Sequence, residues 1–165
     1  MKPTVQQRLR ITFAKGEEIK YISHLDLMRL WERTLRRARA PLAYSQGFNP
    51  RPKMAVAAPL PVGLTSRGEV MDIVLERVIS PYNFARGLTR HLPPGLELLS
   101  VEEVYPKLPS LQSQARSAEY QVTVSWDGSQ EGVKEKLREL LSAEQLLRQR
   151  RGKDYDLRSD RGSVA

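Results

Sequence analysis

The chain has 165 residues, with 27 Lys and Arg against 19 Asp and Glu, and a formal net charge of +8. This length suits one compact domain, or one domain and part of a second. The absence of cysteine excludes a disulfide scaffold, a Cys-ligated zinc site, an iron–sulfur cluster and a cysteine nucleophile. Because only two histidines are present and no phosphate-binding glycine motif occurs, we expect neither a metal centre nor a bound cofactor.

The N-terminus lacks the apolar core of a signal peptide. No apolar stretch approaches the ~20 residues that a membrane-spanning helix needs. We therefore expect a cytoplasmic protein with no membrane partner.

The positive charge is concentrated at the beginning of the chain. Residues 1–60 hold 12 Lys and Arg against 4 Asp and Glu, which accounts for the whole net charge, since residues 61–117 hold 6 of each sign and residues 118–165 hold 9 of each. This distribution predicts one basic face, and nucleic acid is the commonest polyanion that such a face binds. The alternative is a solvated surface that only keeps the protein soluble.

The first predicted elements are a strand and a helix. Residues 8–14 alternate between apolar and polar side chains, as expected of a half-buried strand. Ser23 is placed to cap a helix over residues 23–40, with Asp26 three residues later, where the helix N-terminus favours an acidic group. A stripe of apolar residues at helical spacing predicts that one face of this helix lies in the core.

The middle of the chain predicts three further strands and a second helix. The strands are expected at 53–58, 69–76 and 96–105, and the helix at 82–91 with Pro81 at its first position. The order strand–helix–strand–strand–helix–strand predicts an α+β, ferredoxin-like βαββαβ sandwich over residues 8–105, with both helices on one face of a four-stranded antiparallel sheet.

A polar linker is expected at 106–117, after which the pattern starts again. Residues 119–126 alternate like the first strand, a helical stripe that ends at Leu147 runs through 131–149, and 153–157 is a candidate third element. So short a segment buries too little surface to fold independently. Residues 118–165 are therefore predicted to be a partial second βαβ repeat with a disordered C-terminal tail, a truncated tandem ferredoxin-like arrangement.

The polar side of the first helix carries the strongest binding candidates. They are Arg29, Arg33, Arg36 and Arg37. Guanidinium groups bind phosphates in bidentate fashion, so four on one face would contact several phosphates of a nucleic-acid backbone. The alternative is an ordinary solvated helix face, although Glu32 is the only acidic residue between Arg29 and Arg39.

The loop after this helix combines aromatic, amide and basic side chains. Its candidate binding residues are Tyr44, Gln46, Phe48, Asn49, Arg51 and Lys53. The aromatic rings could stack on unpaired bases, and the amides could contact base edges. Alternatively, the loop is a rigid connection locked by prolines, and Phe48 fills the core. For Arg51 and Lys53, which lie between prolines where no helix or strand requires them, binding is the favoured interpretation.

His24 and Asp26 are the weak candidates for catalysis. An imidazole can act as a general base, but no third group is in view to orient it. The alternative is a histidine that caps the helix or orders the preceding turn.

Three runs of this chain carry a resemblance to a known family. They are Tyr21–Arg33, Leu42–Lys53 with its run Ser45-Gln-Gly-Phe-Asn-Pro-Arg-Pro52, and Pro59–Gly63. Over about residues 8–158 the chain resembles a radical-SAM-linked domain of unknown function, found alone or at the C-terminus of radical SAM proteins. The resemblance implies a genomic association with radical SAM enzymes and with ribosome and ribonuclease genes, and hence with RNA.

The resemblance also bears on the chain's end and on its chemistry. Family members usually continue after residue 158 with a proline and further strands, whereas this chain ends in Ser159–Ala165, so we expect a second repeat that is cut short. Radical SAM chemistry needs three cysteine thiolates for its cluster. A chain without cysteine could only assist a separate enzyme.

Three functions follow from these observations. The leading hypothesis is a non-catalytic RNA-binding module that assists a radical SAM protein or acts in rRNA or tRNA processing or modification. The second is a metal-independent endoribonuclease with His24 as its base, by fold analogy with the RNA-processing endonucleases of CRISPR systems. The third is an adaptor whose basic face binds an acidic protein. The sequence leans against an enzyme.

Overall fold

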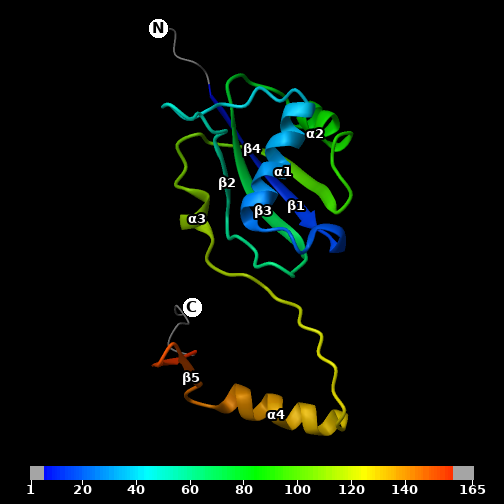
Figure 1. Ribbon diagram of the computed structural model, residues 1–165, viewed down its shortest axis with the longest axis vertical. Coiled ribbons are helices and arrows are strands. Elements are labelled where there is room, and N and C mark those ends of the chain that lie inside the picture. Colours follow the sequence, from blue (N-terminus) through cyan, green and yellow to red (C-terminus); the bar gives the residue numbers. More distant parts are fainter. Residues whose placement is uncertain (1–5, 158–165) are drawn as a thin grey trace. The chain divides into compact units, whose positions relative to one another are not determined.

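The computed structural model describes residues 6–157, and the chain divides into two units, residues 1–118 and 119–165. The strands of the first unit are β1 (Gln7–Lys15), β2 (Met54–Val56), β3 (Ser66–Leu75) and β4 (Leu96–Val104). Its helices are the 3-10 turn η1 (Glu17–Ile19), α1 (His24–Arg37), α2 (Pro81–Thr89) and the short α3 (Leu111–Gln114). The first unit is therefore a mixed α+β fold, as the sequence predicts (Figure 1).

The four strands form one antiparallel sheet in the order β2-β3-β1-β4. The central strand β1 pairs on one side with β3, placing Ile11 opposite Met71, and on the other side with β4, placing Ile11 opposite Val101. Both sheet neighbours of β1 are thus distant from it in the sequence, and β1 is buried between them.

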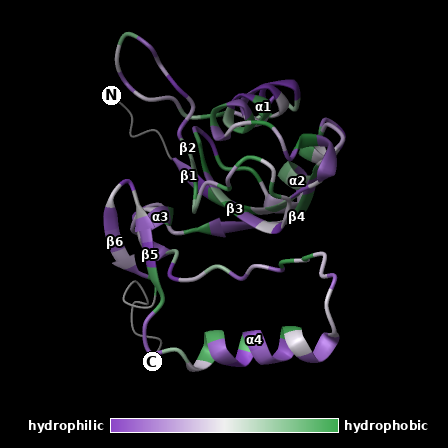
Figure 2. Ribbon diagram, turned by 60° about the horizontal axis from the view of Figure 1, so that its bottom comes forward, coloured by the Kyte–Doolittle hydropathy of each residue, from purple (hydrophilic) through white to green (hydrophobic). Residues whose placement is uncertain are grey.

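The core lies between this sheet and two helices. Leu9, Ile11 and Phe13 of β1 are fully buried, because alternate residues of a strand project from the same face. Trp31 of α1 packs edge-on against Phe13, with ring centroids 4.9 Å apart. The buried residues of α2 belong to the same cluster, so α1 and α2 cover the same face of the sheet (Figures 1 and 2).

The opposite face of the sheet carries a charged cluster. The carboxylate of Asp72, almost completely buried, accepts hydrogen bonds from Arg8 and, at 2.8 Å, from Nε of Arg10. Burial opposes ionisation of Asp72, but the hydrogen bonds from the two guanidinium groups outweigh it, so the pKa of Asp72 is lowered. This network ties β1 to β3 on the face of the sheet opposite α1 and α2.

The first half of the predicted polar linker packs on the first unit. Arg8 donates hydrogen bonds to the carbonyls of Leu108 and Pro109, and Gln112 donates one to the carbonyl of Val56 at 2.8 Å. Leu111 is buried. Leu111, the single apolar residue of α3, anchors the segment. No periodic pattern in the sequence predicts this contact.

The described part of the second unit, residues 119–157, contains one helix and one hairpin. Helix α4 (Gln130–Ser142) begins at Ser129, whose hydroxyl accepts a hydrogen bond from the backbone N–H of Gly132. Strands β5 (Leu147–Arg150) and β6 (Lys153–Asp156) pair antiparallel across Arg151 and Gly152, both with positive φ. Two left-handed residues in a two-residue turn match the twist of a hairpin.

Two predictions for the second unit are wrong. Residues 119–126 form no strand, because a strand needs a neighbour for its backbone groups and none pairs with it within residues 6–157. The helical stripe predicted through 149 ends at Ser142, and Leu147 belongs to β5 instead, where the local hairpin turn determines the conformation. The predicted disordered tail at 159–165 lies outside the described residues.

None of the helices within residues 6–157 is long and apolar enough to cross a membrane.

Candidate nucleic-acid interface

Helix α1 presents its arginines because its other side is fixed in the core. Leu27, Trp31 and Leu35 are buried, and this spacing turns the residues between them outward. The helix start is held by a reciprocal cap. The Ser23 hydroxyl accepts a hydrogen bond from the backbone N–H of Asp26 and donates one to its carboxylate at 2.7 Å. The predicted Ser23 cap is therefore confirmed.

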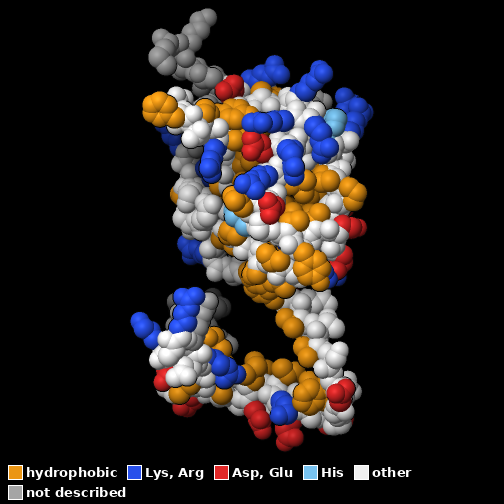
Figure 3. Space-filling model, in the orientation of Figure 1, with side chains coloured by type: hydrophobic (Ala, Val, Ile, Leu, Met, Phe, Trp, Pro, Cys, Tyr) orange, Lys and Arg blue, Asp and Glu red, His pale blue; other side chains and the backbone are white. Residues whose placement is uncertain are grey.

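The exposed side of α1 and the turn after it are strongly basic. Five arginines of this segment are exposed: Arg29, Arg33, Arg36, Arg37 and Arg39. Figure 3 shows Lys and Arg side chains gathered on the face of the first unit on which α1 lies, with few acidic side chains among them. The structure thus brings together the four arginines that the sequence singles out, and it adds Arg39, whose φ of 54° turns the chain away from the helix.

The arginines differ in how they are held. Arg29 pairs with Asp26 at 3.3 Å, Arg36 pairs with Glu32 at 2.7 Å, and Arg37 donates a hydrogen bond to the carbonyl of His91. The side chain of Arg33 makes neither an ion pair nor a hydrogen bond with any described residue. The stripe therefore offers one unengaged guanidinium between neighbours with fixed positions.

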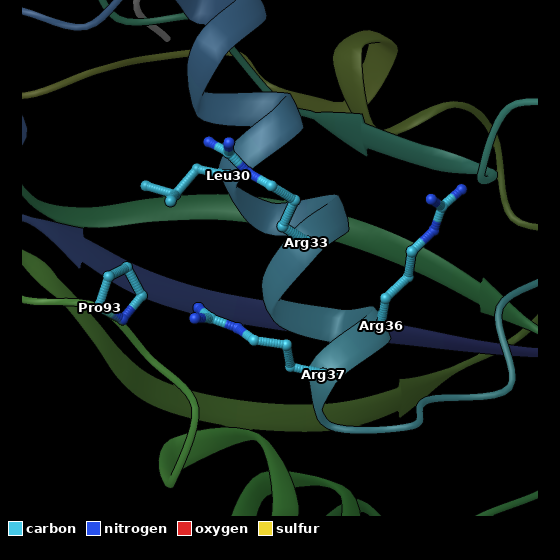
Figure 4. A pocket seen from close by; sticks show the side chains of 5 residues that line it. All are labelled: Leu30, Arg33, Arg36, Arg37 and Pro93. Carbon is cyan, nitrogen blue, oxygen red and sulfur yellow. The ribbon is translucent and has the colours of Figure 1, made fainter.

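Three of these arginines surround a pocket. Leu30, Arg33, Arg36, Arg37 and Pro93 line a cavity of about 460 Å³. In Figure 4, Arg37 extends from the helix toward Pro93, whereas Arg36 extends to the other side of the helix axis. The apolar part of the lining comes from Leu30 and Pro93, and the rim carries only positive charge. Sequence spacing predicts the arginines, but it does not predict that the turn before β4 closes the pocket.

The loop at residues 44–53 is an ordered arm at the edge of the sheet. The backbone N–H of Ser45 donates to the carbonyl of Arg51 at 2.8 Å, and the N–H of Arg51 donates to the Ser45 hydroxyl at 3.0 Å. Gly47 takes a φ of 123°, which other residues rarely adopt, so the chain reverses there. The expectation that no strand requires Lys53 is wrong for its backbone, which bonds to Ala43 and Val74 and extends β2.

Phe48 lies at the tip of this arm and is completely exposed, at 104% of the reference accessible area. The interpretation in which Phe48 fills the core is therefore wrong. The side chains of Gln46, Asn49, Arg51 and Lys53 are exposed as well. The sharp reversal over Gly47 and Pro50 keeps this segment too far from the core for its aromatic ring to be buried.

Tyr44 connects the arm to the arginine stripe. Its ring packs partly against the core, and its hydroxyl accepts a hydrogen bond from Nε of Arg36 at 3.4 Å. The Arg36 guanidinium also lies 6.0 Å from the centre of the Tyr44 ring. This hydrogen bond, followed by the charge of Glu32, raises the pKa of Arg36. Tyr44 therefore positions Arg36 and offers less free surface for a base than Phe48 does.

Several basic residues of the first 60 are engaged within the fold. Arg8 and Arg10 are bound to Asp72, and Lys20 pairs with Glu17 at 2.6 Å. Lys15 is buried, and its ammonium group donates a hydrogen bond to the carbonyl of Lys20. The excess charge that is available to a ligand therefore lies on α1 and on the arm.

The structure also buries a lysine and a glutamate that the sequence analysis missed. Lys15 and Glu69 both project from the core face, and burial lowers the pKa of Lys15 and raises the pKa of Glu69. Strand parity was the available signal, since Lys15 continues the series Leu9, Ile11, Phe13. Their burial beside the end of α1 that carries His24 makes them part of the fold's interior, away from the arginine pocket.

The weak catalytic candidates are not assembled into a site. The Asp26 carboxylate is engaged by Ser23 and Arg29, and the hydrogen bond from Ser23 is the main reason that its pKa is lowered. His24 is exposed, and its imidazole makes no hydrogen bond with any residue from 6 to 157. Within the same range, no three histidine or carboxylate side chains are grouped as metal ligands would be.

Comparison with known families matches residues 8–160 to a single description, "uncharacterized protein conserved in bacteria (DUF2344)". The chain belongs to the DUF2344 family. No curated protein matches it. The unknown function implied by the resemblance is thus confirmed, whereas the family description carries no link to radical SAM enzymes, and that link stays a prediction.

Proposed function

We propose that this DUF2344 protein is a non-catalytic RNA-binding module that recognises unpaired nucleotides. Phe48 is the observation that carries the proposal, because a completely exposed phenylalanine on an ordered arm gains nothing for the fold. Phe48 is the most exposed of the large apolar side chains within residues 6–157, and a ligand that covers its ring would gain part of the few kcal/mol that burial of an aromatic ring contributes. An unpaired base has the flat, apolar face that fits.

The arginines of α1 supply the second half of such a site. Arg33, Arg36 and Arg37 surround the pocket, and Arg36 contacts Tyr44 at the base of the arm. A nucleic-acid strand that stacks a base on Phe48 would carry its phosphates toward these groups. Backbone phosphates dominate the affinity of such complexes and make it depend on salt.

The proposal extends to the fold and to the partner enzyme. The strand order β2-β3-β1-β4, with α1 and α2 on one face, supports a ferredoxin-like assignment for residues 8–105. The resemblance described above supports an accessory role beside a radical SAM protein, or in rRNA or tRNA processing or modification. The adaptor function remains the alternative, since an acidic protein could also bind the arginine face.

The test of the arm compares single-stranded RNA with a duplex of the same sequence. Phe48→Ala should weaken binding to the single strand about 5- to 150-fold, the equivalent of the ~1–3 kcal/mol that one stacked base contributes. Binding to the duplex should be unaffected, because its bases are already stacked. Tyr82→Ala, which removes a similarly exposed ring from α2, is the control. Equal binding of Phe48→Ala and wild type to the single strand would refute the proposal.

The test of the stripe compares two double charge reversals. Arg33→Glu with Arg36→Glu should reduce the slope of log affinity against log salt by about two units, one for each lost phosphate contact. Arg67→Glu with Arg77→Glu makes the same change in net charge at exposed positions of β3 and the turn after it. If both doubles weaken RNA binding equally, only net charge matters. If neither double variant weakens RNA binding, but Arg33→Glu with Arg36→Glu no longer binds an acidic partner protein, the adaptor function is correct.

A further inference from the structure

Residues 119–126 expose a row of apolar side chains that no described neighbour covers. Tyr120, Val122, Val124 and Trp126 are between 48% and 77% exposed. In an extended chain, alternate residues project from the same face, so these four side chains form one apolar strip. Figure 1 draws the segment as coil leading into α4.

The composition of this segment is that of a paired strand. Valine, tyrosine and tryptophan are enriched in sheets because they pack against cross-strand neighbours. Left alone, the segment exposes both its apolar strip and its backbone groups, which favours addition of another strand. Within residues 6–157 no strand pairs with it, so its backbone groups are open to a strand from a second chain.

The order of the side chains identifies that partner. The run Tyr120-Gln-Val-Thr-Val-Ser-Trp126 has the same pattern in both directions, with Thr123 at its centre. We propose that the segment pairs antiparallel with the same segment of a second copy of this chain, about a two-fold axis at Thr123. The pairing sets Tyr120 opposite Trp126 and Val122 opposite Val124, and aromatic and β-branched pairs of this kind stabilise antiparallel sheets.

Two alternative edges within the chain fit less well. The free edge of the sheet at β4 carries Glu97, Glu102 and Glu103, all exposed, and charged side chains on an edge oppose strand addition. The edge at β2 is in contact with α3, whose Gln112 already bonds to the carbonyl of Val56. Residues 120–126 contain no charge, so a second copy meets no charge repulsion along these seven residues.

Helix α4 supplies the layer that such a ribbon needs. A two-stranded ribbon is marginally stable by itself, and it becomes stable when an apolar layer packs on it. On α4, Val133 and Leu137 lie one turn apart, and Leu137 is half exposed. Figure 2 shows hydrophobic and hydrophilic residues alternating along this helix, as expected when one side packs and the other is solvated. Each copy thus contributes one strand and one covering helix.

The pairing makes a prediction about salt that is opposite to that for RNA. Extending the register by one residue places Glu119 opposite Asp127 at both ends of the ribbon. Salt screens this like-charge repulsion, so dimerisation should strengthen as salt rises, whereas RNA binding should weaken. The two associations can therefore be separated in one protein.

Because the chain has no cysteine, a single introduced cysteine tests the register directly. Thr123→Cys should form a disulfide-linked dimer under mild oxidation, since the two copies of residue 123 face each other. Gln145→Cys, exposed between α4 and β5, is the matched control and should stay monomeric. Wild type should sediment at twice 18.8 kDa. Val122→Lys should return it to 18.8 kDa without changing the melting of the first unit.

Two results would overturn the proposal. One is a wild-type protein that sediments as a monomer at micromolar concentration in high salt. The other is equal disulfide formation by Thr123→Cys and Gln145→Cys, which would indicate random collision. Phe48→Ala should leave the dimer intact, so failure of the RNA proposal does not affect this test.

Discussion

The two units of this protein have similar sequence patterns and very different degrees of burial. In the first unit, alternating residues of β1 and β3 are fully buried beneath α1 and α2. In the second unit, the alternating residues of 119–126 and several leucines of α4 and β5 are exposed. Both segments 8–14 and 119–126 alternate strictly, so alternation alone does not produce a buried strand.

The difference lies in strand neighbours. β1 obtains partners that are about 60 and 90 residues away, and each pairing aligns its apolar face with another. Among residues 119–157, strands pair only in the local hairpin β5–β6, which closes through a two-residue turn. An alternating apolar pattern therefore predicts which face of a strand can be buried. Pairing with distant strands determines whether that face is buried in the fold.

The two tryptophans give the largest expected difference. Trp31 is fully buried against Phe13, so Trp31→Ala should lower the free energy of unfolding by about 3–5 kcal/mol. Trp126 is half exposed, so Trp126→Ala should change it by less than about 1 kcal/mol. Urea unfolding followed by circular dichroism measures both. Equal losses would mean that the second unit is as tightly packed as the first.

A milder substitution at Trp31 isolates one polar atom. Nε1 of Trp31 is buried and has no hydrogen-bond partner in the described structure. Leaving a buried donor unpaired costs about 1–3 kcal/mol. Trp31→Phe removes that N–H together with part of the ring, so its cost should be much smaller than that of Trp31→Ala. A loss as large as that of the alanine variant would contradict this expectation.

Asp72 provides an intermediate effect, with its own dependence on pH. Asp72→Asn leaves Arg8 and Arg10 without their counterion and should cost about 3 kcal/mol, whereas exposed Asp154→Asn in β6 should cost almost nothing. Because the pKa of Asp72 is lowered in the fold, its stabilisation is present above the unfolded value of about 3.9 and is lost as pH falls through the folded value. The wild type should therefore lose stability in acid more steeply than Asp72→Asn, as measured by urea unfolding between pH 6 and pH 2. Parallel pH curves would contradict this linkage.

The elements of the first unit could be predicted because each has a local signal. Ser23 before the helix, Pro81 at the start of α2 and the alternation of β1 all lie where the structure uses them. The docking of Leu111 was not predictable, since one apolar residue in a polar segment has no period. The strand predicted at 119–126 has the alternation typical of a strand, but no described strand pairs with it. A single sequence does not reveal whether a pairing partner exists.

Some features of the candidate site could also be predicted from the sequence, and others could not. The arginines of α1 follow from helical spacing, because a buried stripe at Trp31 and Leu35 fixes which residues face solvent. Whether Phe48 is inside or outside could not be decided from its neighbours, as an aromatic residue among prolines and glycine suits either place. The pocket closed by Pro93 depends on a turn some 60 residues away along the chain, and only the fold brings the two together.

The smallest expected effect concerns His24 and separates a binding module from an enzyme. Ser23 makes the cap of α1, so Ser23→Ala should cost about 1 kcal/mol, whereas His24→Ala, at an exposed first position, should cost less than about 0.5 kcal/mol. The RNA should stay intact with both proteins, because Asp26 is engaged by Ser23 and Arg29 and is not placed to orient the imidazole. If His24 were a general base, the wild type would cut RNA without added metal. His24→Ala would then cleave RNA about 10²–10⁴-fold more slowly. RNA cleavage is measured by incubating labelled single-stranded RNA with each protein in the presence of a chelator. Ser23→Ala is the control for lost stability. Metal-independent cleavage that disappears only in His24→Ala would show that the protein is a ribonuclease and not a non-catalytic binding module.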